Sequence, residues 1–252
     1  MPNLRPKMSS SECPASHRLP RGEDGFIALD VETANADISS ICQIALVWFA
    51  AGQPVDAWHS LVNPREPFAS MNVALHGIDA AAVQYAPDFA GVMCAVSALL
   101  AGRVVASHMP FDRIAIERAC SQHGIPPLTC IWIDTARIAR LVWPRFAKKG
   151  YGLRSLASWR GIDFRHHDAV EDAGAAGRIL AHAVAESGIS LEGWLSYSKA
   201  SKSSSRKIVD NDRASGNRYR RPPSRYAAGT AERSSQLGRA FESEPRQCET
   251  KS

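Results

Sequence analysis

The hydrophobic positions of the chain fall into short β-type runs near its beginning and into helical repeats farther along. Residues 41–49 and 55–62 are rich in β-branched and aromatic side chains, and the short link between them predicts a hairpin. An earlier run, 26–33, is apolar until two acidic residues appear near its end. The pattern therefore predicts three consecutive strands that open the fold as a meander.

From residue 89 onward the apolar spacing changes. Residues 89–100 repeat an apolar side chain every three or four positions, which predicts a helix. Further strands are predicted at 103–107 and 131–133, and further helices after Pro110, after Thr135 as its cap, and over 153–159 and 168–186. This order predicts one α/β domain over residues 25–190, with a five-stranded mixed sheet flanked by helices.

The last predicted helix carries a stripe of mostly small side chains. Its members are Val170, Ala173, Gly174, Gly177, Ala181 and Val184. Small residues allow a helix axis to lie close to its neighbour, which here should be the sheet. Asp172 lies beside this stripe, so we expect its carboxylate to be directed at the same neighbourhood.

Composition adds limits to this picture. The 252 residues are 45% hydrophobic and 22% charged, as in ordinary globular proteins. No apolar run approaches the ~20 residues of a membrane helix, and the first 25 residues lack the apolar segment of a secretory signal. Six cysteines have no metal-finger spacing and are expected to be reduced thiols. We therefore expect a cytoplasmic protein without a membrane span.

The charge is unevenly distributed. Residues 199–252 hold 13 Lys and Arg against 6 Asp and Glu, a net +7 in a chain whose total is +5. This tail has few aliphatic residues, so we expect it to be disordered, like the extension 1–24. Arginines alternate with Tyr219 and Tyr226 in the tail. That pattern suits loose binding to nucleic acid, and a solubilising tail without a partner is an equal alternative.

Four carboxylates follow predicted strands or lie on the last helix. Asp30 and Glu32 are two residues apart on the first strand, so they project from the same face. Asp112 follows the fourth strand, and if these strands are parallel neighbours their ends meet where open α/β sheets place ligands. With Asp172, the cluster would be strongly repulsive without cations. Two Mg²⁺ or Mn²⁺ ions would turn it into a site for phosphoryl transfer.

Three motifs occur along the chain in a fixed order. They are Asp30-Val-Glu-Thr33, Phe111-Asp112, and His167 followed five positions later by Asp172. With these motifs the chain resembles the DEDDh exonucleases, which include the proofreading epsilon subunit of bacterial DNA polymerase III, RNase T and oligoribonuclease. The resemblance covers roughly residues 26–187. The His-x4-Asp spacing separates this subgroup from relatives that have a tyrosine instead of the histidine.

The resemblance implies a ribonuclease H-like fold and stepwise hydrolysis of DNA or RNA from a single-stranded 3′ end, releasing nucleoside 5′-monophosphates. It implies two Mg²⁺ (or Mn²⁺) ions held by Asp30, Glu32, Asp112 and Asp172, with His167 as general base. It implies substrate contacts by Thr33, Ala34, His108 and Phe111. A DNA polymerase or another replication or repair protein is an implied partner.

Histidines near the motifs leave alternatives open. An imidazole with a pKa of about 6.5 suits a general base, and nearby carboxylates should raise that value somewhat. His166 could be the base instead, although only His167 has the family spacing to the aspartate. His59 and His76 lie outside the motifs and are predicted to be structural.

Other charged residues also have two interpretations. Asp168 and Glu171 could be extra ligands, but their spacing at a helix start favours a capping box. Lys148 and Lys149 could steer phosphates or form a solvated loop.

A second function also fits the sequence. Residues 33–35 lack the glycine that commonly follows the first motif, and His108 stands where many relatives have an asparagine. The alternative is a catalytically weak nucleic-acid-binding or polymerase-associated module on the same fold. A ribonuclease H-like endonuclease is a third, weaker hypothesis.

Overall fold

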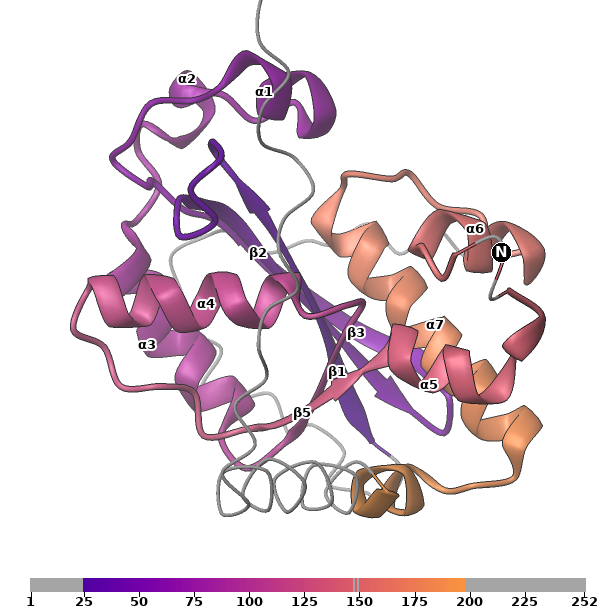
Figure 1. The fold of residues 1–252 in the computed structure, drawn as a ribbon. Coiled ribbons are helices and arrows are strands. Elements are labelled where there is room, and N and C mark those ends of the chain that lie inside the picture. Colours follow the sequence, from indigo (N-terminus) through magenta and orange to yellow (C-terminus); the bar gives the residue numbers. More distant parts are fainter. Residues whose placement is uncertain (1–24, 147, 149, 198–252) are drawn as a thin grey trace, which may run out of the picture. The chain divides into compact units, whose positions relative to one another are not determined.

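The computed structural model describes residues 25–146, 148 and 150–197. Within them, five strands form one mixed sheet in the order β3-β2-β1-β4-β5 (Figure 1). The strands are β1 (Phe26–Thr33), β2 (Ile41–Ala50), β3 (Gln53–Leu61), β4 (Val104–Ser107) and β5 (Ile131–Asp134). β1, β2 and β3 are an antiparallel meander, and β4 and β5 continue the sheet parallel to β1. The predicted mixed sheet is confirmed, and the predicted extensions 1–24 and 199–252 lie outside the described residues.

Besides the helical residues 191–197, seven α-helices and one 3-10 helix connect or cover the described strands. They are α1 (Ser70–His76), α2 (Ala80–Val83), α3 (Phe89–Leu100), α4 (Phe111–Gln122), α5 (Thr135–Val142), η1 (Pro144–Phe146), α6 (Leu153–Trp159) and α7 (Ala169–Ser187). The four long predicted helices and α6 are confirmed. The sequence pattern did not reveal α1, α2 and η1. α2 and η1 are too short to show a helical repeat, and α1 buries none of its side chains, so it has no apolar stripe.

The two faces of β1 lead to different cores. Ile27, Leu29 and Val31 are buried with α3 and α4 on one face. Phe26 and Ala28 are buried with α5, α6 and α7 on the other. The alternation of side chains along the strand produces this division. It also places Asp30 and Glu32 on the α7 side of the sheet, where Figure 1 shows α7 crossing the strands.

Helix α7 lies unusually close to the sheet at Gly177. A Cβ atom added there would be 2.1 Å from the Cε2 atom of Phe49 on β2. The Phe49 ring is held in place by stacking on Phe26, with ring centroids 4.8 Å apart. The predicted close approach of the small-residue stripe is therefore confirmed, and it fixes the position of Asp172 five residues earlier on the same helix.

The domain extends beyond the expected boundary at residue 190. Residues 191–197 are helical, and Leu191 and Trp194 are each only 5% exposed in the core that α5 and α7 share. Seven helical residues, about two turns, with two anchoring side chains give little periodic signal, so the sequence pattern did not indicate this segment.

The predicted cap of α5 is wrong by one residue. Asp134, not Thr135, accepts hydrogen bonds from the N–H groups of Ala136 and Arg137. Thr135 is fully buried and points into the protein instead. Either residue type can cap a helix, so burial rather than propensity decided between them.

The described cysteines and helices agree with the sequence analysis. Cys42, Cys94, Cys120 and Cys130 are free thiols, and two of them, Cys42 and Cys120, are buried. None of the helices in the described ranges has both the length and the apolar character required to cross a membrane.

Candidate active site

Three carboxylates from distant parts of the sequence converge at the end of β1. Ligand oxygens of Asp30, Glu32 and Asp172 all lie within 4.8 Å of one another. β1 supplies the first two and the first turn of α7 supplies the third. The tertiary structure thus brings together the acidic residues that the sequence predicted as a cluster.

Asp112 lies beside this group of three. It is 3% exposed, and its Oδ1 atom accepts a hydrogen bond from the backbone N–H of Val31 at 3.2 Å. This contact joins the first turn of α4 to the end of β1. The negative charge of Asp112 also raises the pKa of Asp30. Asp112 therefore supports the cluster from one side, through the strand backbone.

Burial and mutual repulsion raise the pKa values of these acids. The pKa of Asp30 is well above its ordinary value, first because it is buried and then because of the charges of Asp112 and Asp172. Burial, followed by the charge of Asp172, raises the pKa of Glu32 to about 7. Burial raises the pKa of Asp112 to about 7 despite its bond from Val31. Ionisation of these acids at neutral pH is therefore unfavourable in the metal-free fold. A set of carboxylate oxygens at this spacing fits Mg²⁺ or Mn²⁺.

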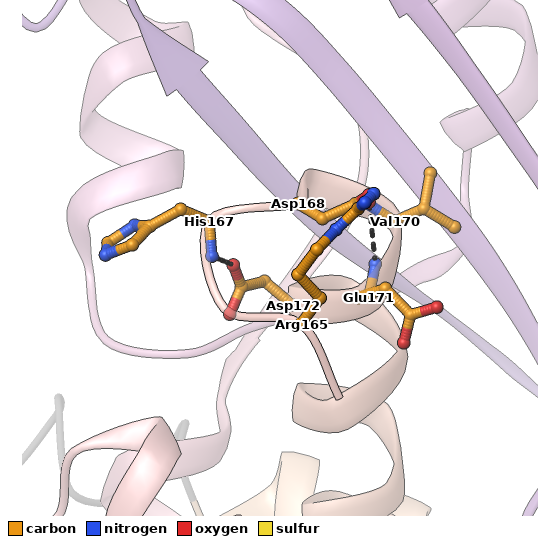
Figure 2. Close-up of polar contacts among 6 residues, drawn as sticks. All are labelled: Arg165, His167, Asp168, Val170, Glu171 and Asp172. Carbon is orange, nitrogen blue, oxygen red and sulfur yellow. Dashed lines mark hydrogen bonds and ion pairs between the residues drawn. The ribbon is translucent and has the colours of Figure 1, made fainter. Parts of the chain in front are cut away.

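His167 meets Asp172 through its backbone. Figure 2 shows its N–H group donating to the Asp172 carboxylate, at 2.7 Å from Oδ2. The residue adopts φ +67°, a left-handed conformation that is uncommon for a side chain other than glycine. Such backbone strain is frequent at functional sites.

His166 contacts the same carboxylate through its ring. Its Nδ1 atom lies 2.7 Å from Oδ1 of Asp172, and its ring stacks on that of His167 with centroids 4.1 Å apart. Both histidines therefore adjoin the cluster, and sequence spacing alone did not reveal the His166 contact. Burial, followed by the charge of His166, lowers the pKa of His167. The predicted rise is wrong, because burial outweighs the neighbouring carboxylate.

Asp168 is a helix cap. Its Oδ1 atom accepts hydrogen bonds from the N–H groups of Val170 and Glu171 at 3.2 and 3.3 Å, and its other oxygen pairs with Arg165 (Figure 2). The Glu171 side chain is exposed at the surface of α7. Asp168 thus caps the helix as predicted, whereas the reciprocal bond of a capping box, from the Asp168 N–H to the Glu171 carboxylate, does not occur among the described residues.

The residues just after the two acids of β1 are held by α1. The carbonyl of Thr33 accepts hydrogen bonds from Asn72 Nδ2 at 2.8 Å and from His76 Nε2 at 3.1 Å. His76 Nδ1 in turn accepts from the N–H of Ile78, so Nε2 carries the proton. The structural role predicted for His76 is confirmed. Sequence reasoning missed Asn72, because nothing indicated the short helix that carries it.

The four predicted substrate contacts differ in exposure. Thr33 is 7% exposed and Ala34 is fully buried, so they present mainly backbone. Phe111 is 43% exposed at the start of α4, and its ring is open to a partner. His59 and Lys148, both outside the cluster, are exposed, and Lys149 lies outside the described residues.

His108 uses both ring nitrogens inside the protein. Nε2 donates to the carbonyl of Tyr151 at 2.8 Å, and Nδ1 lies 2.7 Å from the Thr135 hydroxyl. Burial lowers the pKa of His108, which agrees with a neutral ring. His108 therefore joins the end of β4 to the start of α5. A substrate contact by this ring stays a prediction, and it would require one of these bonds to open.

Taken together, the sheet order and the converging carboxylates are typical of one class of protein, the nucleases of ribonuclease H-like fold. A family model described as an RNase T-type exonuclease matches residues 27–180. The chain belongs to this family of phosphodiester-hydrolysing enzymes, the DEDDh exonucleases that its motifs indicated. Members of the family generally use divalent metal ions.

Curated relatives include much longer proteins. The PolC-type DNA polymerase III of Lactococcus lactis is 28% identical over 177 residues, which is 69% of this chain but 11% of the polymerase. The PolC-type enzyme of Bacillus subtilis is 27% identical over 175 residues, 66% of this chain and 12% of the polymerase. The chain thus matches a small part of each polymerase.

Solved structures share the fold. Exonuclease X in complex with 5′ overhanging duplex DNA has a TM-score of 0.56 and 22% identity, covering 68% of this chain and 98% of that one. The nuclease domain of 3′hExo, a DEDDh family member bound to rAMP, has a TM-score of 0.56 and 17% identity, covering 66% and 93%. These similarities confirm the predicted ribonuclease H-like fold.

Proposed function

We propose that this chain is a metal-dependent 3′–5′ exonuclease that shortens DNA or RNA from a single-stranded 3′ end and releases nucleoside 5′-monophosphates. The observation that carries the proposal is the convergence of Asp30, Glu32 and Asp172 within 4.8 Å. Three carboxylates at this spacing, one buried and two partly buried, are unfavourable for stability alone, so a metal-dependent role explains their presence.

Each acidic residue has a position suited to this role. Asp30, Glu32, Asp112 and Asp172 would hold two Mg²⁺ (or Mn²⁺) ions. When bound, these ions supply an activated water and stabilise negative charge on the phosphate. Asp112 is oriented by its hydrogen bond from Val31, so its carboxylate keeps one direction beside the metal ligands.

His167 would accept the proton of the attacking water. Its pKa is lowered by burial, so its ring is neutral at physiological pH and has a free nitrogen lone pair. The bond from its backbone to Asp172 fixes the loop, and thereby the start of the side chain, next to the acidic cluster. His166, bonded through its ring to the same carboxylate, is less available as the base.

The substrate and partner follow from the surroundings of the site. Phe111 presents an open ring on which a terminal base can stack. Thr33 and Ala34 would contact the last nucleotide mainly through backbone atoms. Association with a DNA polymerase or a replication or repair protein is supported by the PolC-type relatives, and cytoplasmic action by the free thiols of the described residues.

A degradation assay with matched DNA and RNA strands tests this function. A 5′-labelled single strand with Mg²⁺ should give a ladder that shortens one nucleotide at a time, and Asp30→Ala should abolish it. Glu171→Gln is the matched control, because it removes an exposed carboxylate one residue from Asp172 and should leave the ladder unchanged.

Other results would point to the alternatives. A first product cut from the middle of the strand would indicate an endonuclease. Binding that persists in chelator, without any product in Mg²⁺, would contradict the proposal and favour a nucleic-acid-binding module.

A further inference from the structure

We propose a second metal site in this protein, made of His166, His167 and Asp172, that takes Zn²⁺ and competes with the acidic cluster for Asp172. Zinc binding at this site stands on the geometry alone, whereas the inhibition expected from it rests on the proposed exonuclease function. The site would make the enzyme sensitive to a metal other than the one it uses.

The three side chains already lie close together. A ring nitrogen of each histidine and a carboxylate oxygen of Asp172 are all within 4.8 Å of one another. Tetrahedral zinc with bonds of about 2.0–2.1 Å needs its ligand atoms about 3.3 Å apart. Oδ1 of Asp172 and Nδ1 of His166, at 2.7 Å, are already closer than this distance. Each imidazole binds a metal in the plane of its own ring, so one of the two stacked rings must turn about its side-chain bonds to complete the site.

The backbone favours this arrangement. His167 is at φ +67°, and in this conformation its ring stacks on that of the preceding residue with an interplanar angle of 24°. Two adjacent histidines in an ordinary extended segment would point to opposite faces. The left-handed turn instead keeps both imidazoles on the side of Asp172, whose side chain is 5% exposed.

Donor chemistry separates the two metal sites. The cluster of Asp30, Glu32 and Asp172 offers only oxygen, which suits Mg²⁺ or Mn²⁺. The site with two imidazoles and one carboxylate suits Zn²⁺, which binds nitrogen ligands well. Asp172 belongs to both groups, so zinc on the histidine side would draw this carboxylate from the acidic cluster. It would also occupy His167, the proposed base.

Zinc binding to the metal-stripped full chain tests the site directly. Calorimetry should show a Zn²⁺ site whose affinity falls at least about tenfold in His166→Gln. His166→Phe keeps an aromatic ring without nitrogen, so it should lose the same affinity if ligation is the cause. His59→Gln removes an exposed histidine elsewhere on β3 and should bind like the parent. Parental zinc affinity in both His166 variants would overturn the site.

Spectroscopy and activity separate this inference from the proposed function. Co²⁺ in place of zinc should give a visible absorption band of tetrahedral type in the parent, and the band should be lost in His166→Phe. In excess Mg²⁺, Zn²⁺ should inhibit the parent and His59→Gln at a concentration at least about tenfold lower than it inhibits His166→Gln. A parent that binds zinc through His166 without inhibition would overturn the competition. A parent inactive in Mg²⁺ alone would contradict the proposed function, while the zinc titration would still decide the site.

Discussion

The backbone N–H of His167 donates to Oδ2 of Asp172 at 2.7 Å. The peptide group, not the imidazole, forms this bond. The His167 ring is thereby left without a hydrogen bond to Asp172 and can serve as a base, while the loop is fixed by the carboxylate. Several consequences of this geometry can be measured.

Replacing His167 by glycine and by alanine should separate its chemical role from its backbone conformation. Both variants lose the ring, so both should lose about 10²–10⁴-fold in kcat. Glycine accepts φ +67° without strain, whereas alanine does not. The free energy of unfolding in urea should therefore be about 1 kcal/mol greater for His167→Gly than for His167→Ala. Equal stability of the two variants would contradict the observed backbone conformation.

The pH profile of activity should reflect a base with a lowered pKa. At saturating Mg²⁺, the acid limb of kcat/KM should have its midpoint below about pH 6.5, because burial lowers the pKa of His167 from its ordinary value. A protonated ring cannot accept a proton, so the loss lies on the acid side. The acid limb should be absent from the residual activity of His167→Ala. A midpoint above about pH 6.5 in the parent would contradict the lowered pKa.

Stability of the metal-free protein should fall as the pH rises. Glu32 and Asp112 have folded-state pKa values of about 7, above the values of about 4 expected in the unfolded chain. Between these limits the folded state binds more protons, so its stability is lost as pH rises toward and through 7. Urea unfolding in chelator at pH 5.5 and pH 8 measures this loss. Mg²⁺ should raise the melting temperature more at pH 8 than at pH 5.5.

Asp30→Asn should lower the activity of the protein and raise the stability of its metal-free form. The Asp30 carboxylate ionises only against its burial and the charges of Asp112 and Asp172, whereas the amide stays neutral, so the metal-free variant should be more stable than the parent at pH 8. The loss of a metal ligand should lower kcat/KM by about 10³-fold, or about 4 kcal/mol. Glu171→Gln, which removes an exposed charge, is the control and should change neither quantity much. A less stable Asp30→Asn protein at pH 8 would show that repulsion does not dominate the cluster.

Gly177→Ala should destabilise the domain by about 3 kcal/mol, because the new methyl group would overlap the Phe49 ring at 2.1 Å. Gly174→Ala, three residues earlier on the same helix, is the matched control. Its added Cβ would meet only the end of the flexible Arg178 side chain at 3.5 Å. Helix propensity should make Gly174→Ala neutral or up to about 1 kcal/mol more stable. Urea unfolding of both variants compares them, and equal effects would contradict the close contact of α7 with β2.

Most of the fold could be predicted from local sequence patterns. The alternation in β1 separated Ile27, Leu29 and Val31 from the two acids, because side chains of a strand alternate whatever surrounds them. The glycine at 177 indicated a close helix–sheet contact for a similarly local reason. The short helix α1 stayed hidden, since none of its side chains is buried and it therefore has no apolar stripe.

The motifs in the sequence by themselves determined which acids form the site, because the order and spacing of Asp30, Glu32 and Asp172 are properties of the chain. Only the tertiary structure decided which contacts the histidines make near these acids. In the folded protein the His166 ring contacts Asp172, and both ring nitrogens of His108 contact other protein groups. The pKa of His167 is lowered rather than raised. These outcomes depend on burial and on contacts between distant segments. The free energy of an ionised group is set by all its neighbours in space, and a linear pattern does not contain them.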